Sequence, residues 1–234
     1  MKIVLYSGGD NEINEALDLE LLRLAGRTDI RMVYVPFTSY EHSCYFQEFK
    51  KHYRKYGVTD FLYFAPNRQY SKAYIQKVFN SSVIFLSSGN TFVFSNHIKN
   101  NGLSAPFKRF LRRGGILSGM SAGAIVMTPT IKTASVPSLD ADPNKVGLTN
   151  LKGMNLVPFE FSPHYNWDGS TDHELVEYSK RISRPIIACD DGAGIVIEGQ
   201  RIRIVGAGAI FKKGKKQIKK TKTPKRPKLT ALLS

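Results

Sequence analysis

The sequence predicts an α/β protein with a doubly wound, mostly parallel sheet flanked by helices. Short apolar runs alternate with longer amphipathic segments through the first two-thirds of the chain, as strands and covering helices do in such folds. The chain has 234 residues, of which 42% are hydrophobic and 11% aromatic, which is enough apolar surface for a substantial core. No internal repeat or linker interrupts the pattern, so we expect one α/β domain over residues 1–211.

Strands and helices are expected to alternate in the first half of the chain, an order that favours a parallel sheet. The helical spacing is clear in residues 12–25, where Ile13, Leu17 and Leu21 recur on one stripe. The expected strands are 2–6, 31–36, 60–65, 83–87 and 115–118, and the expected helices are 12–25, 43–56, 71–79, 91–100 and 104–113.

The pattern changes after about residue 150, where one helix near 172–182 is followed by three β-rich runs. The pair Gly199-Gln200 separates two of these runs and predicts a tight turn between strands. The last segment, 212–234, contains ten Lys or Arg residues and no acid, with prolines and few apolar residues. Such a composition predicts a basic tail that is disordered beyond a possible last strand.

Charge and composition narrow the functional classes. The formal net charge is +15, but residues 1–211 hold 24 basic residues against 19 acids, so the body is only mildly basic and nucleic acid is disfavoured as a partner. Two cysteines favour a reducing compartment. The apolar start is too short for a signal peptide, and no segment approaches the roughly 18 apolar residues of a membrane span. We therefore expect a soluble cytoplasmic protein that does not enter membranes.

The motif Gly119-Met120-Ser121-Ala122-Gly123 is the most specific local signal. It follows an apolar strand and precedes an apolar helix, the context of a G-x-S-x-G nucleophile elbow. The glycines permit a sharp turn that exposes the Ser121 hydroxyl, and the next backbone N–H, of Ala122, points where an oxyanion would form. A small-residue turn that merely packs a helix against the sheet is the structural alternative.

A serine nucleophile needs a base, and five histidines are available. His164 lies just after a strand-like run, at the kind of strand end where α/β proteins build their sites. We therefore predict His164 as the base, with a purely structural imidazole as the alternative. The other four histidines lie in or beside predicted helices, and we expect each to be either a solvent-exposed surface residue or a core residue: His42, His52, His97 and His173.

A second oxyanion donor is expected from another strand end, in the turn that contains Gly89. The strand at 83–87 runs into this glycine and then into a helix. Asn90 or Thr91 could equally cap that helix, and both roles can coexist at one helix N-terminus.

These motifs together resemble the dipeptidase E and cyanophycinase family of serine peptidases, over roughly residues 1–210. The resemblance implies a fold related to class I glutamine amidotransferases, with serine in place of their cysteine. It implies Ser121 as nucleophile, His164 as base, and Gly89 and Ala122 as oxyanion-hole donors. The motifs that carry it are Ser87-Ser88-Gly89-Asn90-Thr91-Phe92, Gly115-Ile116-Leu117-Ser118-Gly119-Met120-Ser121-Ala122-Gly123-Ala124, Ser162-Pro163-His164-Tyr165 and Asp190-Asp191-Gly192.

The acid that orients the histidine is less clearly marked. Asp190 and Asp191 directly follow a strand-like run, whereas Asp140 and Asp142 lie in a polar segment typical of a surface loop. Asp168, only four residues beyond the histidine, is poorly placed to approach its ring from behind. The resemblance selects Asp191, at a position usually held by a glutamate.

The resulting prediction is a peptidase that hydrolyses short peptides through an acyl-enzyme, with no metal or other cofactor. The resemblance suggests a substrate with an N-terminal aspartate. One alternative is an esterase of the α/β-hydrolase type, with Asp140 or Asp142 as the triad acid. Another is a catalytically silent binding protein whose basic tail attracts polyanions. The sequence leaves the oligomeric state open.

Overall fold

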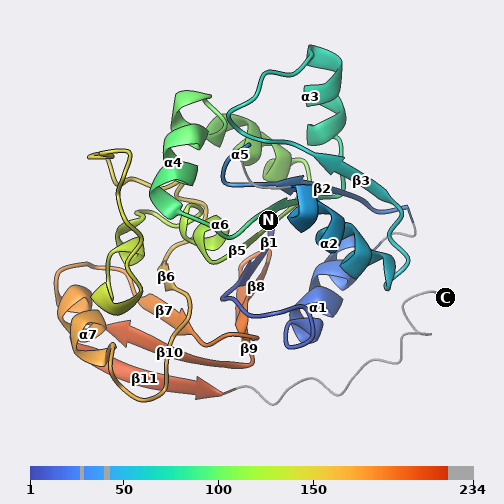
Figure 1. Cartoon of the computed structure of the whole chain (residues 1–234). Coiled ribbons are helices and arrows are strands. Elements are labelled where there is room, and N and C mark those ends of the chain that lie inside the picture. The colour runs from blue at the N-terminus through green and yellow to red at the C-terminus, as the bar shows by residue number, and fades with distance from the viewer. Residues whose placement is uncertain (27–28, 40–42, 221–234) are drawn as a thin grey trace.

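A computed structural model describes residues 1–26, 29–39 and 43–220 (Figure 1). The strands are β1 Lys2–Tyr6, β2 Arg31–Val35, β3 Asp60–Tyr63, β4 Val83–Leu86, β5 Ile116–Met120, β6 Glu160–Ser162, β7 Ile186–Cys189, β8 Gly194–Glu198, β9 Arg201–Val205, β10 Ala207–Lys212 and β11 Lys215–Lys220. The helices are α1 Glu15–Ala25, α2 Ser43–Arg54, α3 Lys72–Phe79, α4 Thr91–Asn100, α5 Ser104–Arg112, α6 Ala122–Ile125 and α7 Asp172–Lys180.

A seven-stranded sheet forms the centre of the fold, in the order β3-β2-β4-β5-β1-β8-β9. The first five strands in this order are parallel, and β8 and β9 add antiparallel strands at one edge. The expected strands and helices of the first half are all present, and the mostly parallel α/β prediction is confirmed. Gly199 and Gln200 form the connection between β8 and β9, as predicted.

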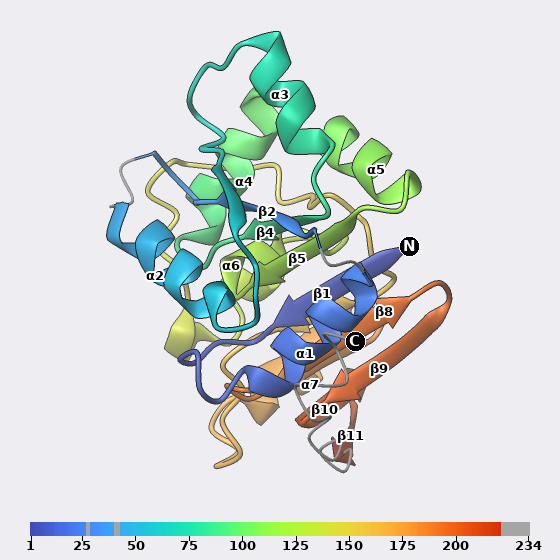
Figure 2. The same ribbon diagram turned by 90° about the vertical axis from the view of Figure 1, so that its right-hand side faces the viewer.

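Helices cover both faces of this sheet, as Figure 2 shows. One face packs against α1 and α2, because Leu17 and Leu21 of α1 and Phe49 of α2 are buried in one cluster with Val4 and Tyr34 of the strands. The opposite face packs against α3, α4 and α5, which contribute a row of buried phenylalanines: Phe79, Phe92, Phe94, Phe107 and Phe110. The helices cover the two faces of the sheet and not the carboxyl ends of its parallel strands. In α/β proteins, ligands bind at these strand ends.

A second sheet of four strands, in the order β11-β10-β7-β6, lies beside the first with α7 packed against it (Figure 1). The sequence indicated late strands but not this separate sheet. Its own small core includes Leu175 of α7, Ile186 of β7 and Phe211 of β10.

The predicted boundary at residue 211 is too early, because β10 continues to Lys212 and β11 pairs with it through Lys220. Lys213 and Gly214 form the turn with φ of 50° and 77°, a left-handed geometry that suits a two-residue hairpin. Lys216 also forms an ion pair with Asp172 at 2.6 Å, which ties the new strand to α7. The remainder of the predicted tail, 221–234, lies outside the described residues.

Among the helices of the described residues, none is long and apolar enough to cross a membrane.

Candidate active site

Ser121 stands at the sharp turn between β5 and α6. Its backbone has φ 50° and ψ −111°, a conformation that costs a non-glycine residue roughly 1–3 kcal/mol and is held here by the surrounding structure. A Cβ added to Gly123 would lie 2.3 Å from the Leu86 carbonyl oxygen, so this glycine lets α6 approach β4 closely. This glycine therefore lets the helix pack against the sheet, and Ser121 lies half-buried at the turn.

His164 lies beside Ser121, although 43 residues separate the two in the chain. Its Nε2 is 2.9 Å from Ser121 Oγ, and its Nδ1 is 2.8 Å from Oδ1 of Asp191. The three predicted residues thus form a continuous hydrogen-bonded row, delivered by the segments after β5, β6 and β7. About 40% of the His164 side chain and 45% of the Asp191 side chain are exposed, so the row is open to solvent in this state.

The two residues predicted as oxyanion donors lie near Ser121 in different ways: Ala122 follows it in the chain, and Gly89 lines the same pocket. Ala122 is the first residue of α6, so no carbonyl lies upstream in the helix to accept its N–H. Gly89 lies between β4 and α4 with φ 132°, a backbone conformation that L side chains rarely adopt, and an added Cβ would meet the Phe37 ring at 2.1 Å. Asn90 does cap α4, because its side chain accepts the Val93 N–H at 3.0 Å.

The end of β1 contacts both the nucleophile and the base, which the sequence did not reveal. The Tyr6 carbonyl accepts the Ser121 N–H at 3.1 Å. The fully buried Ser7 hydroxyl accepts the His164 N–H at 2.7 Å and donates to the Cys189 carbonyl at 2.7 Å. A Cβ added to Gly8 would lie 2.2 Å from the His164 ring, so only glycine leaves room for the imidazole there.

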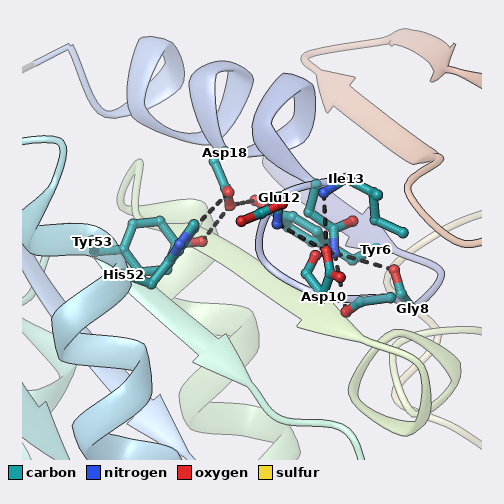
Figure 3. A network of polar contacts seen from close by, with 10 residues as sticks. Tyr6, Gly8, Asp10, Glu12, Ile13, Asp18, His52 and Tyr53 are labelled. Carbon is teal, nitrogen blue, oxygen red and sulfur yellow. Dashed lines mark hydrogen bonds and ion pairs between the residues drawn. The ribbon is translucent and has the colours of Figure 1, made fainter.

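A buried polar network between β1, α1 and α2 holds the end of β1 in place (Figure 3). The Tyr6 hydroxyl donates to Asp18 Oδ1 at 3.0 Å, Tyr53 donates to the same oxygen at 2.8 Å, and His52 Nε2 lies 2.7 Å from Oδ2. Burial, and secondly the Asp18 carboxylate, raises the pKa of Tyr6 well above its usual value. The phenol therefore remains a hydrogen-bond donor.

The Asn14 side chain helps to hold the loop after β1. Asn14 Nδ2 donates to the carbonyls of Gly8 and Asp10 at 3.1 and 2.8 Å. These bonds close the loop onto the start of α1. The strand end that contacts Ser121 and His164 is thus fixed on both sides.

We expect Ser7→Ala to lower kcat for peptide hydrolysis by about 10- to 100-fold with little change in KM. The change leaves the His164 N–H without its partner and removes one of the two hydrogen bonds that the Cys189 carbonyl accepts, the other coming from the Tyr165 N–H. A small displacement of a catalytic group can cost about 10²-fold. Steady-state kinetics measures the split between kcat and KM.

Ser118→Ala is the matched control for this experiment. Ser118 is equally buried and its hydroxyl donates to the Val4 carbonyl at 3.0 Å, without touching His164. An equal loss of kcat in both variants would mean that Ser7 contributes only general stability.

A pocket of about 530 Å³ opens beside Ser121 and His164. Its wall includes the turn at Gly89 and a loop spanning residues 132–142, which folds over the site. Asp140 and Asp142, the alternative triad acids, line this pocket, but the two ring nitrogens of His164 contact Ser121 and Asp191 instead.

The remaining predicted acids lie apart from the histidine ring. Asp190 Oδ2 accepts the Trp167 Nε1–H at 2.8 Å, and Asp168 accepts the Ser170 N–H at 2.8 Å. Among the other histidines, His52 is a core residue, His97 is half-buried with a pKa lowered by desolvation, and His42 lies outside the described residues. No group of three or more His, Cys, Asp or Glu side chains able to hold a metal occurs in the described part of the chain.

Comparison with known proteins shows which proteins this chain resembles. Peptidase E of Nostoc sp. is 24% identical over 206 residues, which cover 82% of this chain and 79% of that protein. A protein of Drosophila melanogaster called probable alpha-aspartyl dipeptidase is 25% identical over 185 residues, covering 75% of this chain and 72% of that one. An uncharacterized peptidase of Listeria monocytogenes is 33% identical over 90 residues, only 43% of its own length.

The fold is shared with a solved structure as well. The crystal structure of a putative peptidase E from Listeria monocytogenes superposes with a TM-score of 0.70 at 21% identity, covering 87% of this chain and 96% of that one. The model of peptidase family S51 matches residues 3–205, which include Ser121, His164 and Asp191. The chain therefore belongs to peptidase family S51, the serine peptidases that include peptidase E.

Proposed function

We propose that this protein hydrolyses short peptides through a Ser121–His164–Asp191 triad and an acyl-enzyme intermediate. The observation that carries the proposal is the 2.9 Å contact between Ser121 Oγ and His164 Nε2, at a serine held in a strained elbow. Family membership supports the same reaction class.

The proposed chemistry follows from the direction of each hydrogen bond. His164 Nε2 takes the proton of Ser121 Oγ as the oxygen attacks the peptide carbonyl, and Asp191 accepts the Nδ1 proton and stabilises the imidazolium. The tetrahedral oxyanion forms near the N–H groups of Gly89 and Ala122. His164 then gives its proton to the leaving amine, and water repeats the sequence on the ester to release the acid.

Other nucleophiles and other triad orders receive less support. Burial raises the pKa of the Cys189 thiol, which opposes formation of a thiolate. The acid nearest His164 follows it in the chain, whereas an α/β-hydrolase esterase has the order serine, acid, histidine. These points favour the peptidase over the esterase.

Dipeptides are the first substrates to test, because the Drosophila relative carries the name probable alpha-aspartyl dipeptidase. That name and the family resemblance make an N-terminal aspartate one arm of the substrate panel. The other arms begin with alanine, leucine and lysine, so that the charge of the first residue varies.

We expect a fluorophosphonate probe to modify Ser121 covalently, because the triad activates this hydroxyl for attack on phosphorus as on a carbonyl. Peptide mass spectrometry locates the adduct. His164→Ala should slow labelling strongly, while Ser118→Ala should leave it intact. An adduct on another serine in the wild-type protein would refute the assigned nucleophile.

A further inference from the structure

A large apolar side chain in the pocket beside Ser121 is exposed to solvent. Leu139 lines this pocket and is 68% exposed, the largest fraction among the exposed large apolar side chains of the described residues. None of the other exposed large apolar side chains in the described part of the chain belongs to that lining. An exposed leucine elsewhere on a surface needs no explanation, but in a substrate pocket it offers apolar area that a ligand can cover.

The loop that carries Leu139 is attached to the body of the protein on both sides of this residue. The Ser138 N–H donates to Glu174 Oε2 at 3.1 Å, and the Ser138 hydroxyl donates to Glu174 Oε1 at 2.7 Å, which attaches the loop to α7. Asp142 Oδ2 accepts the Thr91 N–H at 2.8 Å, which attaches it to the start of α4. Leu139 lies between the two attachments and directly follows the one at α7, so its backbone is held in place before a ligand binds.

Helix α7 also contacts the segment that carries the base. The Tyr165 hydroxyl donates to Asp172 Oδ1 at 2.6 Å, so the residue after His164 is bound to the first turn of α7. Glu174, which holds the end of the loop next to Leu139, belongs to the same turn. Leu139 therefore lies on the His164 side of the pocket.

The chemistry of the proposed reaction decides which part of a peptide reaches this side. His164 Nε2 gives its proton to the leaving amine, so the nitrogen of the residue after the scissile bond lies against His164 in that step. The Cα of that residue is about 1.5 Å from its nitrogen, and its side chain begins there. The side chain of the leaving residue is thus the part of the peptide that Leu139 is placed to meet.

We propose that Leu139 forms an apolar subsite for the side chain of the residue that follows the scissile bond. This inference rests on the proposed function and names a substrate class of that same site: short peptides with a large apolar residue, such as leucine or phenylalanine, in that position. Contact with such a side chain removes apolar surface of both groups from water, which stabilises the complex. The contact does not restrict the first residue, so an N-terminal aspartate is compatible with it.

A peptide series that varies only the second residue tests the subsite. The series is Asp-Gly, Asp-Ala, Asp-Leu and Asp-Phe, with the first residue changed throughout if the substrate panel favours another. We expect kcat/KM to rise about tenfold from Asp-Gly to Asp-Leu, mainly through a lower KM, because this contact is made equally in the ground state and the transition state.

Leu139→Ala should remove most of this preference. We expect kcat/KM for Asp-Leu to fall about fivefold and that for Asp-Gly to change less than about twofold, whereas Leu139→Met keeps the apolar volume and should retain the preference. The midpoint of thermal unfolding should not change, because the side chain is exposed in the free protein. Val146→Ala is the matched control, since Val146 is 40% exposed in the following segment and lies outside the pocket lining, and it should leave every ratio unchanged.

Equilibrium binding separates this proposal from the proposed function. Calorimetric titration of Ser121→Ala, with and without Leu139→Ala, against Asp-Leu and Asp-Gly measures the contact without turnover. Hydrolysis of the series with the same leucine-to-glycine ratio in the wild type and in Leu139→Ala would overturn the subsite and leave the peptidase standing. Tighter binding of Asp-Leu that needs Leu139, without hydrolysis by the wild type, would overturn the function and support the subsite. Neither hydrolysis nor a preference that needs Leu139 would overturn both.

Discussion

Replacing Ser121 with alanine is expected to lower kcat/KM for dipeptide hydrolysis by at least about 10³-fold. Without the Oγ atom no acyl-enzyme forms, and only substrate binding and oxyanion stabilisation remain. The fold should be unaffected, because alanine keeps the Cβ and leaves the backbone geometry as it is. Steady-state kinetics on purified protein and a thermal melt by circular dichroism provide the two measurements.

Ser121→Gly sharpens this experiment, because glycine adopts positive φ without strain. We expect it to be as inactive as Ser121→Ala but to unfold at a higher temperature, since the backbone at φ 50° is then relieved. Substantial hydrolysis by either variant would refute the serine mechanism.

Asp191→Asn is expected to reduce kcat toward the roughly 10⁴-fold loss known for amidation of a triad acid. The amide keeps the shape of the carboxylate but has no negative charge to stabilise the imidazolium, and its NH₂ group can turn toward Nδ1 and favour the wrong tautomer. The expected signature is a loss in kcat with KM nearly unchanged, measured on the same dipeptides.

The neighbouring Asp190 provides a control in the same turn. Its carboxylate accepts a hydrogen bond from Trp167 rather than from His164, so Asp190→Asn should cost less than about tenfold, or ~1.4 kcal/mol of barrier. A damaging Asp190→Asn beside an active Asp191→Asn would reverse the assignment of the third residue while leaving Ser121 and His164 in place.

The sequence predicted the parts of this protein whose signals are local. Apolar runs bounded by turn residues predicted the five parallel strands. The G-x-S-x-G spacing of the glycines predicted Ser121 as the nucleophile. His164 was inferred from its place after a strand, a weaker signal. The choice of Asp191 depended on the family resemblance, because Asp190 and Asp191 are adjacent at one strand end and the sequence does not distinguish them. In the structure, Asp191 contacts the His164 ring and Asp190 contacts the Trp167 ring.

Features built by contacts between distant segments were missed. Ser7 is one serine before two glycines, and nothing local indicates that its hydroxyl joins β1 to the segments after β6 and β7. The loop with Asp140 and Asp142 has the polarity of a surface excursion, and its position over the pocket depends on contacts with α4 and α7. The second sheet is similarly hard to predict, because β6 has only three residues and its partner β7 follows only after α7.

The β10–β11 hairpin places a lysine-rich strand at the edge of the second sheet. β11 is the edge strand of that sheet, and four of its six residues are lysines: Lys215, Lys216, Lys219 and Lys220. An unpaired strand edge invites another chain to add to it, and a row of ammonium groups repels an identical edge. Lys216 is paired with Asp172, so we expect Lys215 and Lys219 to oppose edge-to-edge pairing of two copies through this sheet.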